Sequence, residues 1–170
     1  RIAPYFPEIL KHTANPLYSH IFLLFVLKIR RVQANDIFPV ITLAFDTLPE
    51  RYNPSIFNQF YESFPEGFLI ATRDEFVIGF LIGIKTTQNT ARILMLSVKN
   101  ENRKQGIGSA LLKQFLLEMK IHKVRQVELE VRTTNQSALE FYMKQGFMLR
   151  GLLRKFYQNG EDAYSMRKDL

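Results

Sequence analysis

The sequence predicts a mixed α/β domain, an α+β arrangement in which helices flank a mostly antiparallel sheet. Three observations support this: short apolar runs bounded by turn residues, segments with helical apolar periodicity, and the alternation of the two in the second half. The expected order is β-α-α-β-β-β-α-β-α-β-β, with antiparallel strands first and a βαβ unit at the centre. The chain has 170 residues, 46% of them hydrophobic, which is enough for one domain with a full core.

The first predicted strand spans residues 23–32, where β-branched and aliphatic side chains dominate. A helix follows over residues 35–45, with Asn35 or Asp36 as its N-cap. Pro39 falls in the first turn of this helix, where its missing N–H is tolerated.

A turn-rich loop over residues 46–54 leads to a short amphipathic helix over residues 55–64, with Ser55 as its cap. Two apolar runs, residues 67–74 and 75–86, meet at Arg-Asp-Glu. We expect them to form an antiparallel hairpin.

Residues 90–100 form the next predicted strand, and their near-continuous apolar character predicts burial on both faces. Residues 106–122 have the apolar periodicity of a helix. In residues 124–133 apolar and polar side chains alternate, which predicts a strand with Glu128 and Glu130 on its polar face.

The next predicted element is a helix over residues 135–147, with Asn135 as its N-cap and Gly146 ending it. Two final strands, residues 149–158 and 162–168, flank the turn signal Asn-Gly-Glu.

The composition excludes several kinds of chemistry. The chain has no cysteine, which rules out disulfides, cysteine-ligated zinc and a thiol nucleophile. Its three histidines are scattered, so we predict no metal site. The only strongly apolar run, residues 21–27, is far shorter than the roughly 20 residues that span a bilayer, so we predict no membrane segment.

The net charge of +7 is concentrated in residues 99–125, which hold seven Lys/Arg and two Glu. Such a local positive field suits an anionic ligand, a nucleic-acid surface or merely a solvated face.

Two glycines, Gly106 and Gly108, lie between a predicted buried strand and a predicted helix, just after Arg103 and Lys104. Backbone N–H groups at a helix start are unpaired and carry partial positive charge, which favours phosphate. The loop alone is weak evidence, and it is not a P-loop because no Gly-Lys-Ser/Thr closes it.

The segment "SVKNENRKQGIGSALL" resembles the acyl-CoA-binding motif R-x-x-G-x-G/A of the GNAT acetyltransferase superfamily, with Arg103, Gly106 and Gly108 in register. "LEVRTTNQSALEFYMKQGF" is similar to the following segment in N-terminal protein acetyltransferases, "LPERY" to their substrate loop, and "FYQNGEDAYSMRKDL" to their tail. The resemblance covers about residues 28–170, so we treat residues 1–25 as an extension of unknown role and residues 26–170 as a single GNAT domain.

The resemblance implies a GNAT fold whose central strands splay apart, with acetyl-CoA as cosubstrate and no metal. The pantetheine arm would lie along the strand that holds Leu96 and Val98, near Asn135 and Tyr142. The resemblance places the pyrophosphate beside Arg103, on the backbone amides of Lys104, Gln105, Gly106, Ile107, Gly108 and Ser109.

The resemblance also places Glu130 where family members use a general base and Tyr142 where an acid would protonate the departing thiolate. Glu128 shares the face of Glu130 and is its rival, and water alone could also serve as base. An α-amino group has a pKa of about 7.7–8.0, so a modest base acting through water would be enough.

The acceptor peptide is expected between two walls. Leu48, Pro49, Glu50 and Tyr52 would form one wall and Tyr157 the other, with Glu50 attracting a protonated amine or a basic second residue.

The leading hypothesis is an N-terminal protein acetyltransferase acting on ribosomal or nascent proteins. One alternative is a GNAT enzyme for a small amine, such as a polyamine or antibiotic, or for a lysine side chain. Another is a basic ribosome-binding or nucleic-acid-binding module, which would interleave aromatics with its cations. The sequence leaves ribosome association and a homodimer open, and a cytoplasmic location is expected from the absence of targeting signals and cysteine.

Overall fold

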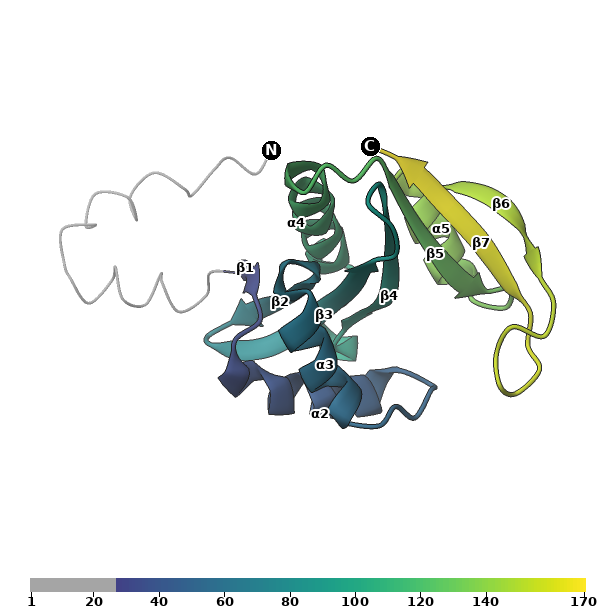
Figure 1. The fold of residues 1–170 in the computed structure, drawn as a ribbon. Helices are drawn as coiled ribbons and strands as arrows, with labels where there is room; N and C mark the ends of the chain where they lie inside the picture. Colours follow the sequence, from purple (N-terminus) through teal and green to yellow (C-terminus); the bar gives the residue numbers. More distant parts are fainter. Residues whose placement is uncertain (1–26) are drawn as a thin grey trace, which may run out of the picture.

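The computed structural model describes residues 27–170. The extension over residues 1–25 and the first part of the strand predicted at residues 23–32 lie outside the described residues. Within residues 27–170 the order of strands and helices is the predicted one, and the mixed, mostly antiparallel sheet flanked by helices is confirmed (Figure 1).

One seven-stranded sheet, in the order β1-β2-β3-β4-β5-β7-β6, organises the structure. Its strands are β1 (Lys28–Arg31), β2 (Phe68–Arg73), β3 (Phe76–Lys85), β4 (Thr90–Val98), β5 (Gln126–Arg132), β6 (Met148–Leu153) and β7 (Ala163–Asp169). The helices are α2 (Ile37–Thr47), α3 (Ser55–Ser63), α4 (Ile107–Ile121) and α5 (Gln136–Lys144), with the 3₁₀ turns η2 (Ala34–Asp36), η3 (Pro65–Gly67) and η4 (Asn100–Asn102).

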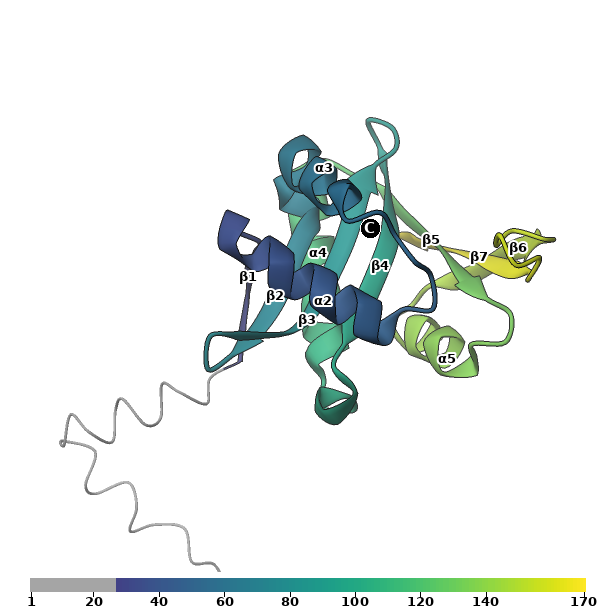
Figure 2. The same ribbon diagram turned by 90° about the horizontal axis from the view of Figure 1, so that it is seen from below.

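Neighbouring strands of the sheet are antiparallel except β4 and β5, which are parallel and joined through α4. The β4–β5 register runs only from Thr90↔Gln126 to Ile93↔Leu129. Beyond that point β4 stays paired with β3, and β5 with β7. The two halves of the sheet therefore separate, as the resemblance implied (Figure 2).

Strand β4 contains a β-bulge, because a register shift against β3 leaves Leu94 as an extra residue. Before the bulge, Ile93 packs in the core under α4; after it, Met95 packs in the core under α2, while Leu96 and Val98 turn toward α4. The prediction that this strand is buried on both faces is wrong. Leu94 is 36% exposed and Leu96 and Val98 are half-buried, because β5 no longer covers this part of β4.

Two hydrophobic cores cover the two faces of the sheet. One lies under α4 and α5 and is centred on the fully buried Phe115, with Leu139 and Phe147 at its α5 end. The other lies under α2 and α3 and contains Phe57 and Phe80. Figures 1 and 2 show α4 on the opposite side of the sheet from α2 and α3.

The predicted hairpin and helix caps were partly right. The β2–β3 turn places Asp74 and Glu75 at φ 52° and 65°, as a tight two-residue hairpin requires. Asn135 caps α5 by accepting a hydrogen bond from the Ala138 N–H at 3.1 Å. The Ser55 cap is wrong, because Ser55 is already helical and its N–H and hydroxyl both donate to the Asn53 side chain.

The end of the chain departs from the prediction. Strand β6 stops at Leu153, and residues 154–162 form a loop in place of the expected strand to residue 158. Lys155 at φ 51° and Gly160 at φ 83° turn the backbone out of the extended conformation. Tyr157 therefore lies in a loop, where its N–H donates to the Glu161 carbonyl at 3.1 Å.

One of the two predicted N-caps of α2 was Asp36, but its side chain does not cap the helix. It connects β1 to the start of α2 instead. Its carboxylate accepts two hydrogen bonds from Arg30, at 2.6 and 3.0 Å, and one from the Gln33 N–H at 2.7 Å. Burial acts to raise the pKa of this carboxyl, but the hydrogen bonds and charge of Arg30 outweigh it, and the pKa lies below its usual value.

We expect Asp36→Asn to lower the free energy of unfolding by about 2 kcal/mol at neutral pH, because it removes charge-assisted hydrogen bonds. A lowered folded-state pKa gives a contribution that is present above the unfolded-state pKa of about 3.9 and is lost as pH falls through the folded value. Urea unfolding from about pH 3 to pH 7 should show wild type and variant converging at the acid end. Asp46→Asn, at an exposed carboxylate of the same helix, is the control. A difference that does not change with pH would contradict the ion-pair explanation.

Candidate active site

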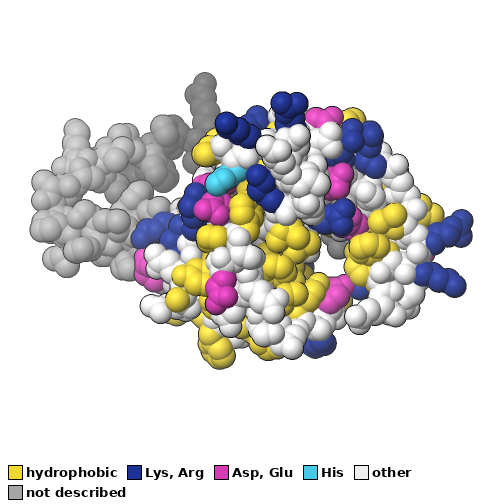
Figure 3. Space-filling model, viewed as in Figure 1, with side chains coloured by type: hydrophobic (Ala, Val, Ile, Leu, Met, Phe, Trp, Pro, Cys, Tyr) yellow, Lys and Arg dark blue, Asp and Glu magenta, His cyan; other side chains and the backbone are white. Residues whose placement is uncertain are grey.

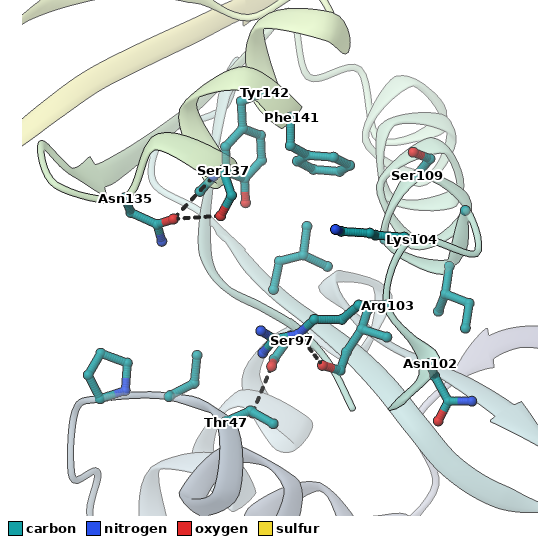
Figure 4. Close-up of a pocket in the computed structure, with 18 residues that line it drawn as sticks. Thr47, Ser97, Asn102, Arg103, Lys104, Ser109, Asn135, Ser137, Phe141 and Tyr142 are labelled. Carbon is teal, nitrogen blue, oxygen red and sulfur yellow. Dashed lines mark hydrogen bonds between the residues drawn. The ribbon is translucent and has the colours of Figure 1, made fainter. Parts of the chain in front are cut away.

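A cleft of about 600 Å³ opens where β4 and β5 part. The space-filling view is hollowed there, with hydrophobic side chains along the walls (Figure 3). Of the residues predicted to bind cosubstrate or acceptor, the cleft is lined by Leu48, Pro49, Leu96, Val98, Arg103, Lys104, Gly106, Ile107, Gly108, Ser109, Asn135 and Tyr142. It is also lined by residues that were not predicted: Thr47, Ser97, Asn102, Ser137, Ala138 and Phe141 (Figure 4).

The glycine-rich turn forms one end of the cleft and leads directly into α4. Gly106 has φ 80°, a left-handed conformation, and the first helical hydrogen bond runs from the Ala110 N–H to the Gly106 carbonyl at 2.9 Å. The N–H groups of Ile107, Gly108 and Ser109 precede that bond, so they are donors at the positive end of the helix dipole. This end of the cleft is suited to a phosphate group.

Gly108 lies in the first turn of α4, where a glycine is not required by the backbone. A Cβ built there would meet only the Phe141 ring, at an ordinary 3.7 Å. The protein itself could therefore hold a side chain at this position, and its absence leaves open space on the cleft side.

Two cations, Arg103 and Lys104, border the turn, and the side chain of the next residue, Gln105, points elsewhere. Arg103 folds back so that its Nε donates to the Val98 carbonyl at 3.0 Å, while Lys104 extends beside the cleft opposite Phe141 (Figure 4). The Gln105 side chain does not line the cleft. It accepts two hydrogen bonds from Arg73, each at 3.1 Å, because the β2–β3 hairpin lies against the turn.

A hydrogen-bonded pair, the buried Ser97 and the half-buried Thr47, lies in the wall of the cleft. The Ser97 hydroxyl of β4 donates to the Thr47 hydroxyl at the end of α2, at 2.7 Å (Figure 4). This bond fixes the start of the 48–54 loop against the sheet. A serine at the end of the apolar run of residues 93–96 in β4 was the available sequence signal for it.

Tyr142 is both a core residue and a lining residue of the cleft. It is 8% exposed and makes edge-to-face contacts with Phe141 and Phe147, at centroid distances of 5.1 and 5.5 Å. Its hydroxyl points into the cleft (Figure 4). Burial raises the pKa of this phenol above its usual value, with a smaller contribution from Tyr157, so it stays protonated at neutral pH.

Glu128 and Glu130 lie on the polar face of β5, just outside the residues that line the cleft. Arg92 of β4 approaches both carboxylates, at 3.3 Å from Glu128 and 3.5 Å from Glu130. The Glu130 side chain is 12% exposed against 30% for Glu128. Burial raises the pKa of Glu130, Arg92 opposes the shift, and the Glu128 charge adds to it.

The remaining predicted acceptor residues, Glu50, Tyr52 and Tyr157, lie together with Glu130 and with two residues that were not predicted, Arg132 and Glu161. We call these six residues the acceptor-side cluster. Arg132, which was not predicted, forms ion pairs with Glu50 and Glu161. Burial, and then the Glu50 charge, raise the pKa of Tyr52 to about 12. Apart from Gln105, the predicted site residues thus divide between the cleft and this cluster.

Within residues 27–170, no three His, Cys, Asp or Glu side chains are grouped so that they could hold a metal ion. Over the same residues, no helix combines the length and the apolar character needed to cross a membrane.

An opened mixed sheet with a helix start suited to phosphate at the opening is the arrangement that the resemblance to the GNAT acetyltransferases implied. The profile of the Acetyltransferase (GNAT) family matches residues 37–147. The chain belongs to this family.

Similar proteins include archaeal and eukaryotic enzymes. An uncharacterized N-acetyltransferase of Methanocaldococcus jannaschii is 36% identical over 143 residues, covering 82% of this chain and 90% of its own. An N-alpha-acetyltransferase of Sulfurisphaera tokodaii is 30% identical over 155 residues, covering 84% and 93%.

Two solved structures of similar proteins have the same fold. Ard1 from Thermoplasma volcanium superposes with a TM-score of 0.82 at 34% identity, covering 85% of this chain and 97% of that one. Naa20 from Chaetomium thermophilum, solved with a bisubstrate analogue, gives a TM-score of 0.76 at 26% identity, covering 84% and 86%.

The two loop glycines should respond oppositely to alanine. Gly106→Ala should lower the free energy of unfolding by about 1–2 kcal/mol, because an L-residue is strained at φ 80°. Gly108→Ala should raise it by about 0.5–1 kcal/mol, because alanine is the better helix former and meets no clash. Thermal unfolding of the two variants beside wild type measures both, and destabilisation by both would mean that Gly108 has a structural role.

Proposed function

We propose that this enzyme transfers an acetyl group from acetyl-CoA to the α-amino group of protein N-termini. The observation that carries the proposal is the cleft between β4 and β5, which has the start of α4 at one end and Tyr142 in its lining, with Glu130 of β5 just outside it. The relatives named N-alpha-acetyltransferase support this choice of acceptor.

Acetyl-CoA supplies the acyl group as a thioester and leaves as a thiol. The amides from Lys104 to Ser109 would hold its pyrophosphate, with charge from Arg103 and Lys104. Gln105 would contribute only its backbone, because its side chain is held by Arg73.

The pantetheine arm would run along Leu96 and Val98, where β4 has lost its parallel partner and offers backbone donors and acceptors toward the cleft. Asn135 uses its side-chain oxygen to cap α5, which leaves its amide NH₂ to bond the arm. Both roles of Asn135 can therefore coexist.

Glu130 would act as general base for the acceptor amine through a water molecule. The raised pKa of Glu130 is closer to the pKa of the amine, which makes the carboxylate a better proton acceptor. The Glu130 side chain is also less exposed than that of Glu128. Glu128 lies closer to Arg92 and further into solvent, which favours Glu130 as the base.

Tyr142 would donate its hydroxyl proton to the departing sulfur. A phenol with a raised pKa is fully protonated at neutral pH and is a hydrogen-bond donor into the cleft. The side chain is held in place by Phe141 and Phe147, so the proton would be delivered from a fixed position.

The acceptor peptide would lie between Leu48, Pro49, Glu50 and Tyr52 on one side and Tyr157 on the other. Glu50 is engaged by Arg132, so its charge is partly neutralised. Attraction of a protonated amine would therefore be shared with the other carboxylates of the acceptor-side cluster.

The binding-module alternative requires aromatic side chains that are exposed among the cations of residues 99–125, and the structure has none there. Phe115 is the one aromatic residue among the cations of residues 99–125, and it is fully buried in the core. Ribosome association, a homodimer, action on ribosomal proteins and a cytoplasmic location stay predictions from the sequence.

The deciding experiment measures CoA release from acetyl-CoA with two peptides, one with a free N-terminus and no lysine, the other N-blocked with an internal lysine. We expect turnover only on the free N-terminus. Glu130→Gln and Tyr142→Phe should each lower kcat about 10²–10⁴-fold, because each removes a proton-transfer group.

Glu128→Gln is the matched control for the base and should retain most activity. A larger loss in Glu128→Gln than in Glu130→Gln would exchange their roles. Turnover on the lysine peptide would move the acceptor to side chains, and turnover on neither would direct the assay to small amines.

Gly108→Ala provides a separate test of the cosubstrate site. A Cβ on the cleft side of the helix start should hold the pyrophosphate away from the amides and raise the acetyl-CoA Kd by about tenfold or more. Isothermal titration with acetyl-CoA measures this, and because the variant should gain stability, unfolding cannot explain the loss. Unchanged affinity would remove Gly108 from the site.

A further inference from the structure

The acceptor side of the cleft is enclosed by two loops that are far apart in sequence. One, residues 48–54, joins α2 to α3, and the other, residues 154–162, joins β6 to β7. Both approach the end of β5 at which the two halves of the sheet are open (Figures 1 and 2).

Arg132, the last residue of β5, contacts both loops. Its Nη2 pairs with the Glu50 carboxylate of the first loop, and its Nη1 lies 2.8 Å from the Glu161 carboxylate of the second. The guanidinium also lies over the Tyr157 ring, 3.8 Å from its centroid. One planar group therefore joins two loops and supports the aromatic ring that is predicted to form one of the two acceptor walls.

We propose that Arg132 is a positioning residue that sets the spacing of the two loops, and with it the width and affinity of the acceptor site. The proposal rests on the proposed function, since it deepens the description of the same site. Arg132 does not line the cleft in which acetyl-CoA is predicted to bind. Replacing it should therefore change the binding of the acceptor peptide and not that of acetyl-CoA.

The anchor for this arrangement is rigid. Strand β5 is paired with β7 along its whole length, from Gln126↔Asp169 to Arg132↔Ala163. The Arg132 side chain is only 16% exposed, so its ion pairs are screened less than surface pairs. The loops can therefore be held against a fixed point of the sheet, two residues along from Glu130.

A second arginine, on the edge strand β1, also bridges two acidic side chains and serves as a control, with its own side chain 49% exposed. Arg31 of β1 lies 3.8 Å from Glu66 and 2.7 Å from Glu118, and so also joins two elements. Glu66 belongs to η3 and Glu118 to α4, and neither lines the cleft. Replacing Arg31 measures what the loss of a bridging arginine costs the fold in general.

The test compares Arg132→Met, Arg132→Lys and Arg31→Met in steady-state assays with the free-N-terminus peptide. Arg132→Met should raise the peptide KM about tenfold to a hundredfold, with a smaller change in kcat and an acetyl-CoA Kd close to that of wild type. Arg132→Lys should recover only part of the loss, because an ammonium cannot bond both carboxylates in one fixed plane. Arg31→Met should leave the peptide KM unchanged.

A double-mutant cycle separates the bridge from its parts. Glu161→Gln should raise the peptide KM in the wild-type background and should have little further effect in Arg132→Met. If the effects of the two substitutions on the free energy derived from the peptide KM simply add, Arg132 does not act through Glu161 and the proposed bridge is wrong.

Amide hydrogen exchange of the ligand-free protein tests the proposal without any assay. Exchange in residues 48–54 and 154–162 should rise in Arg132→Met and not in Arg31→Met. If wild type fails to acetylate the peptide but exchange rises in both loops, the proposed function fails and the bridge stands. If exchange in the loops is unchanged, or if kcat and acetyl-CoA affinity fall while the peptide KM does not move, the positioning role is wrong.

Discussion

The end of the parallel pairing between β4 and β5 is the constraint on which the rest of the structure depends. Their register stops at Ile93↔Leu129, and from there each strand is paired on one edge only. Backbone groups on the free edges need partners, so this gap is suited to an extended ligand that can supply them. The bulge at Leu94 coincides with the separation and turns Leu96 and Val98 toward the opening.

The sheet can open without losing its core because the two halves remain joined through helices on one face. Phe115 of α4 and Leu139 of α5 belong to the same buried cluster. Between the start of α4 and the end of α5, the Gln145 side chain donates to the Ser109 hydroxyl at 3.1 Å, and the Gln145 carbonyl accepts from Lys168 at 2.7 Å. Hydrophobic packing behind the gap thus offsets the hydrogen bonds that the separated strands do not make.

Local patterns predicted the elements whose sequence carries its own signal. Helical periodicity identified α4, and Asn135 and Gly146 marked the two ends of α5 correctly. Ser55 failed as a cap because α3 already begins at Ser55, whose N–H and hydroxyl donate back to the Asn53 side chain. The end of β6 was misplaced because the positive φ at Lys155 comes from the loop's own hydrogen bonds, and a lysine gives no signal of it.

The sequence by itself determined the order of the elements, the glycine turn at the start of α4 and the residue types suited to acetyl transfer, because these depend on neighbours along the chain. Only the tertiary structure decided which carboxylates share Arg92, which side of the cleft each predicted residue occupies and that Arg132 joins two loops. Those contacts span tens of residues of sequence, and an arginine that ends a strand looks the same whether it faces water or two glutamates. Its partners are chosen by the packing of loops that no local pattern encodes.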